Sequence, residues 1–239
     1  MERIEIIRMT EIPDNAMNLA LTNLYETRWS KYQTIVRLFN GVLSLANIYL
    51  LSTTSEYCDA KVRVMILGKE TQGWGGEFAE KNPSILELQQ LYTLYTYEEK
   101  GNGAAFQRFV NWVPTIMEGV SVIPNNIVKI GKASKNGHYA DVANVCNAEL
   151  PLLKEEIMIT KPHLVVVPSS NIEVYNECMA AQLGNCEERL LDEQVSLRYY
   201  ESFPDIPFIV CPHPQGKSIE VLDKIKKIIS EYVFAASEQ

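Results

Sequence analysis

The sequence predicts an α/β fold: a three-layer α/β/α domain around a central, mainly parallel sheet of four strands. Three observations indicate this class. Short runs rich in β-branched residues alternate with longer segments of helical spacing along the 239-residue chain. One run, residues 163–167, is an uninterrupted valine-rich stretch of the kind found in central parallel strands. Unusual polar residues gather in the loops after strands, where open α/β sheets bind their ligands.

The first part of the chain is predicted to be helical. Residues 14–52 follow helical spacing, with Asp14 as the expected N-cap after Pro13. Within this part, the apolar stretch 41–51 is too short to span a bilayer, which needs ~20 residues, and is interpreted as a buried helix. We therefore expect a helical N-terminal portion of about residues 1–60, before a first strand at residues 62–67.

The remaining elements follow in alternation. We expect helix over residues 83–118 with a break at 98–103, a second strand at 121–128, and helix over 141–160, where Pro151 kinks the helix or starts another. After the third strand at 163–167 we expect a helix at 172–183, a short or edge strand at 195–200, a core strand at 207–211, and a final helix at 218–234. No repeat or long linker interrupts this order, so a single domain over residues 1–239 is predicted.

Composition narrows the functional classes. Hydrophobic residues make up 46% and charged residues 22%, as in ordinary folded proteins. The N-terminus lacks a signal-peptide layout, which predicts a cytoplasmic protein without a membrane partner. Five cysteines without a CxxC pair argue against a disulfide framework, a zinc site or an iron–sulfur cluster, so neither metal nor cofactor is expected. The net charge of −8 argues against tight nonspecific binding of nucleic acid.

The loop after the first strand is the first candidate for chemistry. Glu70 lies there among glycines at 68, 73, 75 and 76, which let a backbone turn sharply and approach a ligand. A phosphate-binding P-loop is excluded, because Trp74 stands where that motif requires lysine. Trp74 and Phe78 are costly to expose, which favours a functional loop over a tight surface turn with a solvated acid.

The loop after the second strand carries Asn125 and Asn126. The asparagine amide offers both a donor and an acceptor and suits reading a nucleobase edge, although it also caps turns. Lys129, Lys132 and Lys135 follow with no acid among them. This run is interpreted either as a solvated loop or as a local positive patch that contacts phosphates.

The loop after the last core strand holds His213 between two prolines. Of the three histidines it alone follows a core strand in a stiffened segment. This position favours a role in the site over that of a half-buried packing residue.

Four segments, taken together, resemble motifs of the uracil-DNA glycosylase superfamily, in the family's order. They are VMILGKETQGW, IPNNIVKIGK, KPHLVVVPSS and FIVCPHPQGKS, within residues 64–218. The first is similar to the motif in which a glycine is followed closely by a catalytic acid. The second resembles the strand whose asparagine reads the base, and the last resembles the histidine-proline motif. The third resembles a lysine-proline strand that carries no chemistry.

The resemblance implies roles for individual residues. The family's acid, which orients or activates water, falls on Glu70, and its base-side histidine falls on His213. The base-reading asparagine falls on Asn126, with Asn125 as an offset alternative. The aromatic that stacks on a flipped base falls on Trp74 or Phe78. Gly68 and Lys69 complete the substrate-binding loop that the resemblance implies.

The resemblance thus predicts a monofunctional DNA glycosylase of base excision repair, with DNA as its partner. A carboxylate near the sugar and a donor near the base oxygen would stabilise the opposite charges that develop as the N-glycosidic bond breaks. Duplex DNA would require base flipping into a nucleobase pocket. Lys69 replaces a glutamine common in the family, and no intercalating loop is recognisable. Two alternatives therefore stay open: a noncatalytic nucleobase- or nucleic-acid-binding module, and a hydrolase of nucleosides or nucleotides.

Overall fold

A computed structural model describes residues 11–39, 42–70, 73–75, 83–98, 105–133, 140–169 and 173–238. Contacts group the chain into two compact units that alternate along the sequence. The first unit comprises residues 1–54, 69–99 and 126–160, and the second comprises residues 55–68, 100–125 and 161–239. The single domain expected from the sequence stays a prediction.

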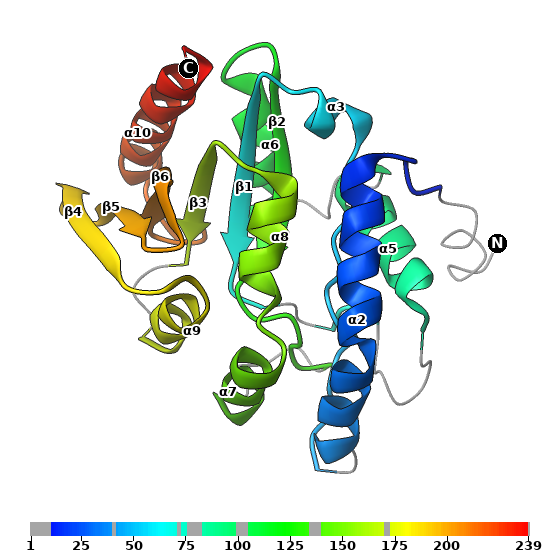
Figure 1. The fold of residues 1–239 in the computed structure, drawn as a ribbon. Helices are drawn as coiled ribbons and strands as arrows, with labels where there is room; N and C mark the ends of the chain where they lie inside the picture. The colour runs from blue at the N-terminus through cyan, green and yellow to red at the C-terminus, as the bar shows by residue number, and fades with distance from the viewer. Residues whose placement is uncertain are drawn as a thin grey trace. The chain divides into compact units, whose positions relative to one another are not determined.

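The second unit contains a mixed sheet of six strands in the order β2-β1-β3-β6-β5-β4 (Figure 1). The strands are β1 (Val62–Gly68), β2 (Val120–Asn126), β3 (Leu164–Pro168), β4 (Cys186–Asp192), β5 (Val195–Tyr200) and β6 (Phe203–Cys211). Strand β3 pairs in parallel with β1 and β6, whereas β5 is antiparallel to both β6 and β4. An α/β fold is therefore present, but the expected four-stranded sheet is wrong: the sheet has six strands.

Strand β4 is the element that the sequence analysis missed. Its first five residues are all exposed, so it shows none of the apolar alternation that marks a half-buried strand. It forms because β5 supplies its backbone partners, in a register that joins Cys186 to Tyr200 and Asp192 to Val195. The strand expected at 195–200 is confirmed as β5, and β4 takes the edge position.

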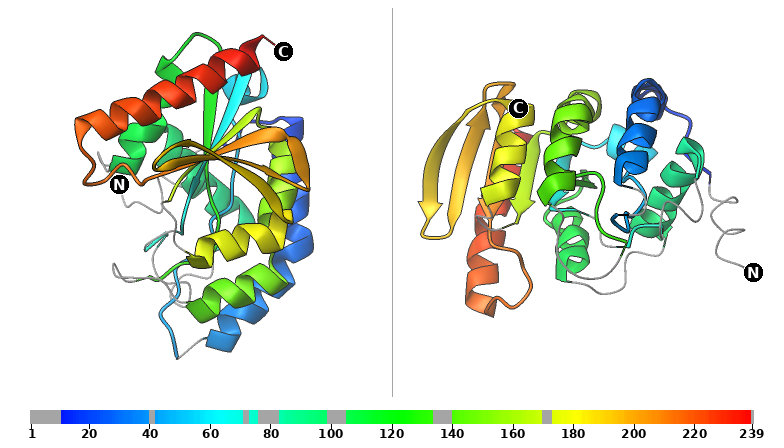
Figure 2. Two further views of the ribbon diagram at one scale, coloured as in Figure 1. Left: turned by 90° about the vertical axis from the view of Figure 1, so that its left-hand side faces the viewer. Right: turned by 90° about the horizontal axis from the view of Figure 1, so that it is seen from below.

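Alternation along the strands divides the core of the second unit between two faces. Val64 and Ile66 of β1, with Ile209 of β6, belong to one cluster that includes α6 (Ala105–Trp112) and α10 (Ile219–Ser237). On the other face, Phe208 packs on Tyr200 with ring centroids 4.9 Å apart, and the Tyr200 hydroxyl meets Met179 of α9 (Glu173–Leu183). Figure 2 shows α10 and α9 on opposite sides of the strands β5 and β6.

The final helix follows its sequence signals. Ser218 is its N-cap and accepts a hydrogen bond from the Val221 amide. Ile225, Ile229 and Val233 form its buried stripe, at helical spacing. The other elements of the second unit are the short helix α3 (Ser55–Cys58) and the 3₁₀ turn η2 (Val113–Thr115).

The first unit is built from helices. They are α2 (Ala16–Phe39), α5 (Ile85–Thr93), the π-helix η1 (Leu94–Glu98), α7 (Ala140–Glu149) and α8 (Leu152–Thr160). Helix α2 contacts α5, α7 and α8. The cap of α2 is Asn15, whose side chain accepts from the Asn18 amide, and not Asp14 as expected. Pro151 separates α7 from α8 and so starts a second helix, which settles that alternative.

The helix expected up to residue 52 is wrong in its last part. Residues 44–52 are non-helical, and Leu45, Ile48, Leu50 and Leu51 are all buried. The segment bonds to residues far along the chain: Ala46 N donates to Gly131 O, and Tyr49 N donates to Lys129 O. A continuous apolar run has no period that separates a buried helix from a buried extended segment, so only these tertiary partners decide its conformation.

Among the described residues, no helix has both the length and the apolar character that a bilayer crossing requires.

Candidate functional site

The loop that leaves β1 is fixed by backbone hydrogen bonds inside the first unit. Lys69 O accepts from Val128 N at 2.9 Å, and Gly73 N donates to Lys132 O at 2.7 Å. Asn47 N donates to Trp74 O at 3.1 Å. The loop is thus held between the extended segment 44–52 and the segment 127–133, both of which are distant from it in sequence.

Two glycines of this loop adopt conformations that other residues rarely take. Gly73 and Gly75 have φ angles of +63° and +64°. A Cβ atom on Gly75 would lie 3.0 Å from both Asn47 Nδ2 and Leu91 Cδ2. The glycines are therefore needed for the path of the loop, as the sequence suggested. Gly76 lies outside the described residues.

Glu70 is the titratable group of this loop with the largest perturbation. Burial of the carboxyl group raises its pKa to about 7, against an ordinary value of 4.5, while the nearby Lys132 and Lys69 ammonium groups oppose the rise. Burial also lowers the pKa of Lys69. A carboxyl group that titrates near neutral pH exchanges protons readily, which is the property required of a general base.

The three lysines after β2 have different environments. Lys129 is only 2% exposed and its Nζ lies 2.5 Å from Oε2 of the fully buried Glu156 in α8. The sequence predicted that this lysine run is either solvated or in contact with phosphates. Both alternatives are wrong for Lys129, because its ammonium group is buried and paired. Lys132 is half-buried, and its positive charge lowers the pKa of Glu70. Lys135 lies outside the described residues.

Trp74 packs inside an aromatic cluster of the first unit. Its ring centroid lies 4.8 Å from that of Tyr49 and 5.5 Å from that of Tyr95, with interplanar angles of 64° and 62°. Tyr95 lies in the π-helix η1, which sequence periodicity did not predict; short π-helical segments are frequent at functional sites. Phe78, the other candidate for base stacking, lies outside the described residues.

The two asparagines at the end of β2 differ in their contacts. Asn125 is 1% exposed, and its Nδ2 lies 3.6 Å from the Met65 sulfur of β1, within the sheet of the second unit. Asn126 is the last residue of β2 and belongs to the first unit, together with Lys69, Glu70 and Trp74. The choice between Asn126 and Asn125 as the base-reading residue stays a prediction.

His213 belongs to the second unit, as does Gly68, the last residue of β1. The ring follows β6 and is stacked on Phe106 of α6, with centroids 6.4 Å apart and an interplanar angle of 12°. Its Nδ1 accepts a hydrogen bond from Gln215 N at 3.1 Å. A neutral ring in this arrangement carries its proton on Nε2, which makes Nε2 a hydrogen-bond donor.

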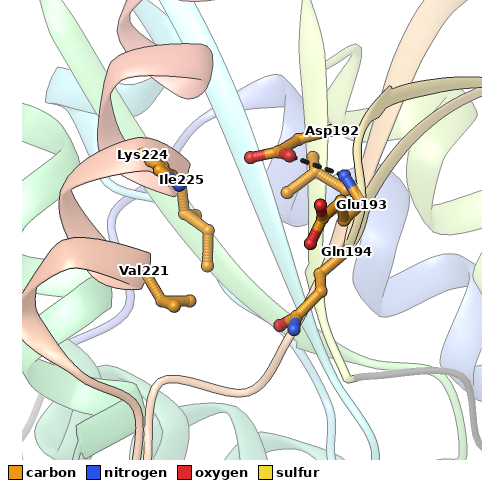
Figure 3. Close-up of a pocket in the computed structure, with 7 residues that line it drawn as sticks. Asp192, Glu193, Gln194, Val221, Lys224 and Ile225 are labelled. Carbon is orange, nitrogen blue, oxygen red and sulfur yellow. Dashed lines mark hydrogen bonds between the residues drawn. The ribbon is translucent and has the colours of Figure 1, made fainter.

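The β4–β5 turn and helix α10 line a small pocket in the second unit (Figure 3). Asp192, Glu193 and Gln194 of the β4–β5 turn face Val221, Lys224 and Ile225 of α10 across it. Its volume of about 60 Å³ is far below the ~300 Å³ at which small-molecule sites begin. It contains none of the predicted site residues, so it is not a candidate for a nucleobase site.

Within the described residues, no group of three or more His, Cys, Asp or Glu side chains has the arrangement of a metal site. No protein-family model matches the chain, and no curated protein is detectably similar to it in sequence.

Proposed function

We propose that the protein hydrolyses the N-glycosidic bond of a uracil-like or modified base in DNA. The proposal includes a three-layer α/β/α arrangement of the uracil-DNA glycosylase type. The observation that carries it is the carboxyl group of Glu70, in the loop after β1, whose pKa of about 7 suits a base that activates water at neutral pH. The order of the four sequence motifs supports the same function.

In the proposed mechanism, two side chains stabilise the opposite charges that develop on the sugar and on the base. Glu70, as a carboxylate, stabilises positive charge on the sugar as the bond to the base breaks, and then accepts a proton from the attacking water. His213 donates through Nε2–H to the base oxygen on which negative charge develops, while its bond from Gln215 holds the tautomer. Asn126 reads the edge of the base, and Lys69 contacts the substrate beside Glu70.

The test is base release from labelled oligonucleotides that carry uracil, hypoxanthine, xanthine or hydroxymethyluracil, in single- and double-stranded form. Release of free base that leaves an abasic site supports the proposal. Binding of these oligonucleotides without release would instead support the noncatalytic binding module. Cleavage of free nucleosides, with oligonucleotides left intact, would support the nucleoside hydrolase.

We predict that His213→Ala lowers the rate constant of base release by about 10²–10³-fold, the usual effect of removing one donor to a developing oxyanion. The matched control is His163→Gln. His163 precedes β3, at the opposite end of the parallel strands from His213, and its Nδ1 accepts a hydrogen bond from Arg63 N. Single-turnover rates on the best substrate of the panel would measure both variants. Equal rates for His213→Ala and the unchanged protein would remove His213 from the mechanism.

We predict that kcat/KM rises about tenfold per pH unit below pH 7 and levels off above it, because only the ionised form of Glu70 accepts a proton. Lys132 lowers the pKa of Glu70, so Lys132→Met is expected to move the midpoint of the profile to higher pH. A profile measured from pH 5 to 9 on both proteins checks this. A midpoint that stays in place in Lys132→Met would mean that another group controls the profile.

A further inference from the structure

The ring of Trp74 packs against aromatic neighbours. Tyr49, only 7% exposed, contacts the indole, and Tyr49 itself packs on Tyr92 with ring centroids 5.3 Å apart. Tyr95 contacts the indole as well, at 5.5 Å. A Cβ atom on the next residue, Gly75, would lie 3.0 Å from Asn47 and Leu91, so the backbone beside the indole is closely packed. The indole is therefore packed between two tyrosine rings of the first unit.

Within the part of the chain that the structure describes, the indole nitrogen of Trp74 is buried and has no hydrogen-bond partner. Buried tryptophan N–H groups usually find an acceptor, and each exception calls for an explanation. The neighbouring backbone is satisfied, since Trp74 O accepts from Asn47 N and Gly73 N donates to Lys132 O. Among the described residues of the loop that carries Glu70, the Trp74 indole nitrogen thus remains a donor without an acceptor.

We propose that Trp74 donates a hydrogen bond through Nε1 to an acceptor atom of the bound nucleobase. Trp74 then reads an edge of the base, in place of the stacking on its face that the sequence suggested. The indole N–H can only donate a hydrogen bond. At the position that it contacts, it therefore favours a keto oxygen over an exocyclic amino group. The inference rests on the proposed function in taking a nucleobase as the ligand, and it adds a preference for keto bases such as uracil and hypoxanthine.

The indole resonances of protein labelled with ¹⁵N at tryptophan test this contact without requiring catalysis. The chain has three tryptophans, and Trp74→Phe assigns the Trp74 signal by its disappearance. Free uracil and hypoxanthine, with cytosine and adenine as their amino counterparts, are the probes. We expect the Trp74 N–H signal to move saturably with the keto bases and less with the amino bases, while Trp29 and Trp112 stay unchanged.

The same variant is then assayed on the oligonucleotide panel, with Trp112→Phe as the matched control in α6 of the second unit. We expect Trp74→Phe to raise KM at least tenfold on these keto bases, since the variant lacks the donor to the keto oxygen. Trp112→Phe leaves KM unchanged.

The failures of the two proposals are distinguishable. Cleavage of oligonucleotides with no movement of the Trp74 signal overturns the role of Trp74 and leaves the proposed function standing. Movement of the signal with keto bases, without cleavage of any substrate, supports the contact and overturns the glycosylase. Neither movement nor cleavage overturns both.

Discussion

Replacing Glu70 by glutamine is expected to lower the rate constant of base release by about 10²–10⁴-fold at pH 8, the contribution of a positioned general base. Glutamine keeps the volume of the side chain but neither carries the negative charge nor accepts a proton from water. At pH 8 most Glu70 carboxyl groups are ionised, because their pKa is about 7. Single-turnover kinetics on a labelled oligonucleotide would measure the loss. The control is Glu118→Gln, an exposed residue on the turn before β2.

Stability separates this catalytic loss from misfolding. Between pH 4.5 and pH 7 the folded chain retains the Glu70 proton, whereas the unfolded chain releases it. The free energy of unfolding therefore falls as pH rises through this window, and Glu70→Gln removes that fall. Thermal unfolding at pH 8 should show the variant at least as stable as the unchanged protein. A Glu70→Gln protein that is stable and fully active would contradict the assignment of Glu70.

Replacing Lys129 by methionine is expected to have the largest effect on stability. Lys129 and Glu156 form an ion pair at 2% and 0% exposure, and the Tyr25 hydroxyl also donates to Glu156, at 3.0 Å. Removing one partner leaves the other charge buried without compensation, which costs about 3–5 kcal/mol. Urea unfolding of Lys129→Met would measure this loss.

Two further variants give this experiment its controls. Lys224→Met breaks an exposed pair with Glu220 in α10, at 3.5 Å, and should cost no more than about 0.5 kcal/mol. The double variant Lys129→Met, Glu156→Gln removes both charges, while the amide oxygen still accepts from Tyr25, and should recover most of the stability. A loss in Lys129→Met as small as that in Lys224→Met would show that the buried pair contributes little.

The same pair shows where sequence interpretation reached its limit. Lys129, Lys132 and Lys135 form one run of like charge in the sequence, and nothing local distinguishes them. Lys129 is buried because Glu156, on a helix 27 residues later, provides its counter-charge. No sequence pattern predicts a partner at that separation.

The contacts among the aromatic residues of the first unit were also only partly predictable from the sequence. The cost of exposing Trp74 correctly indicated that its loop is not a simple surface turn. Its neighbours Tyr49 and Tyr95 were not expected beside it, because they come from a segment interpreted as a helix and from a π-helix. The environment of the Trp74 indole nitrogen exists only once these segments pack together.

The sequence by itself determined the elements whose signals are local. The strands β1 and β3, the final helix and the glycines of the Glu70 loop all depend on period or backbone freedom. Tertiary structure alone decided the extended course of residues 44–52, the edge strand β4, the burial of Lys129 and the raised pKa of Glu70. The physical reason is common to these four: each depends on hydrogen-bond partners, counter-charges or desolvation supplied by residues from elsewhere in the fold.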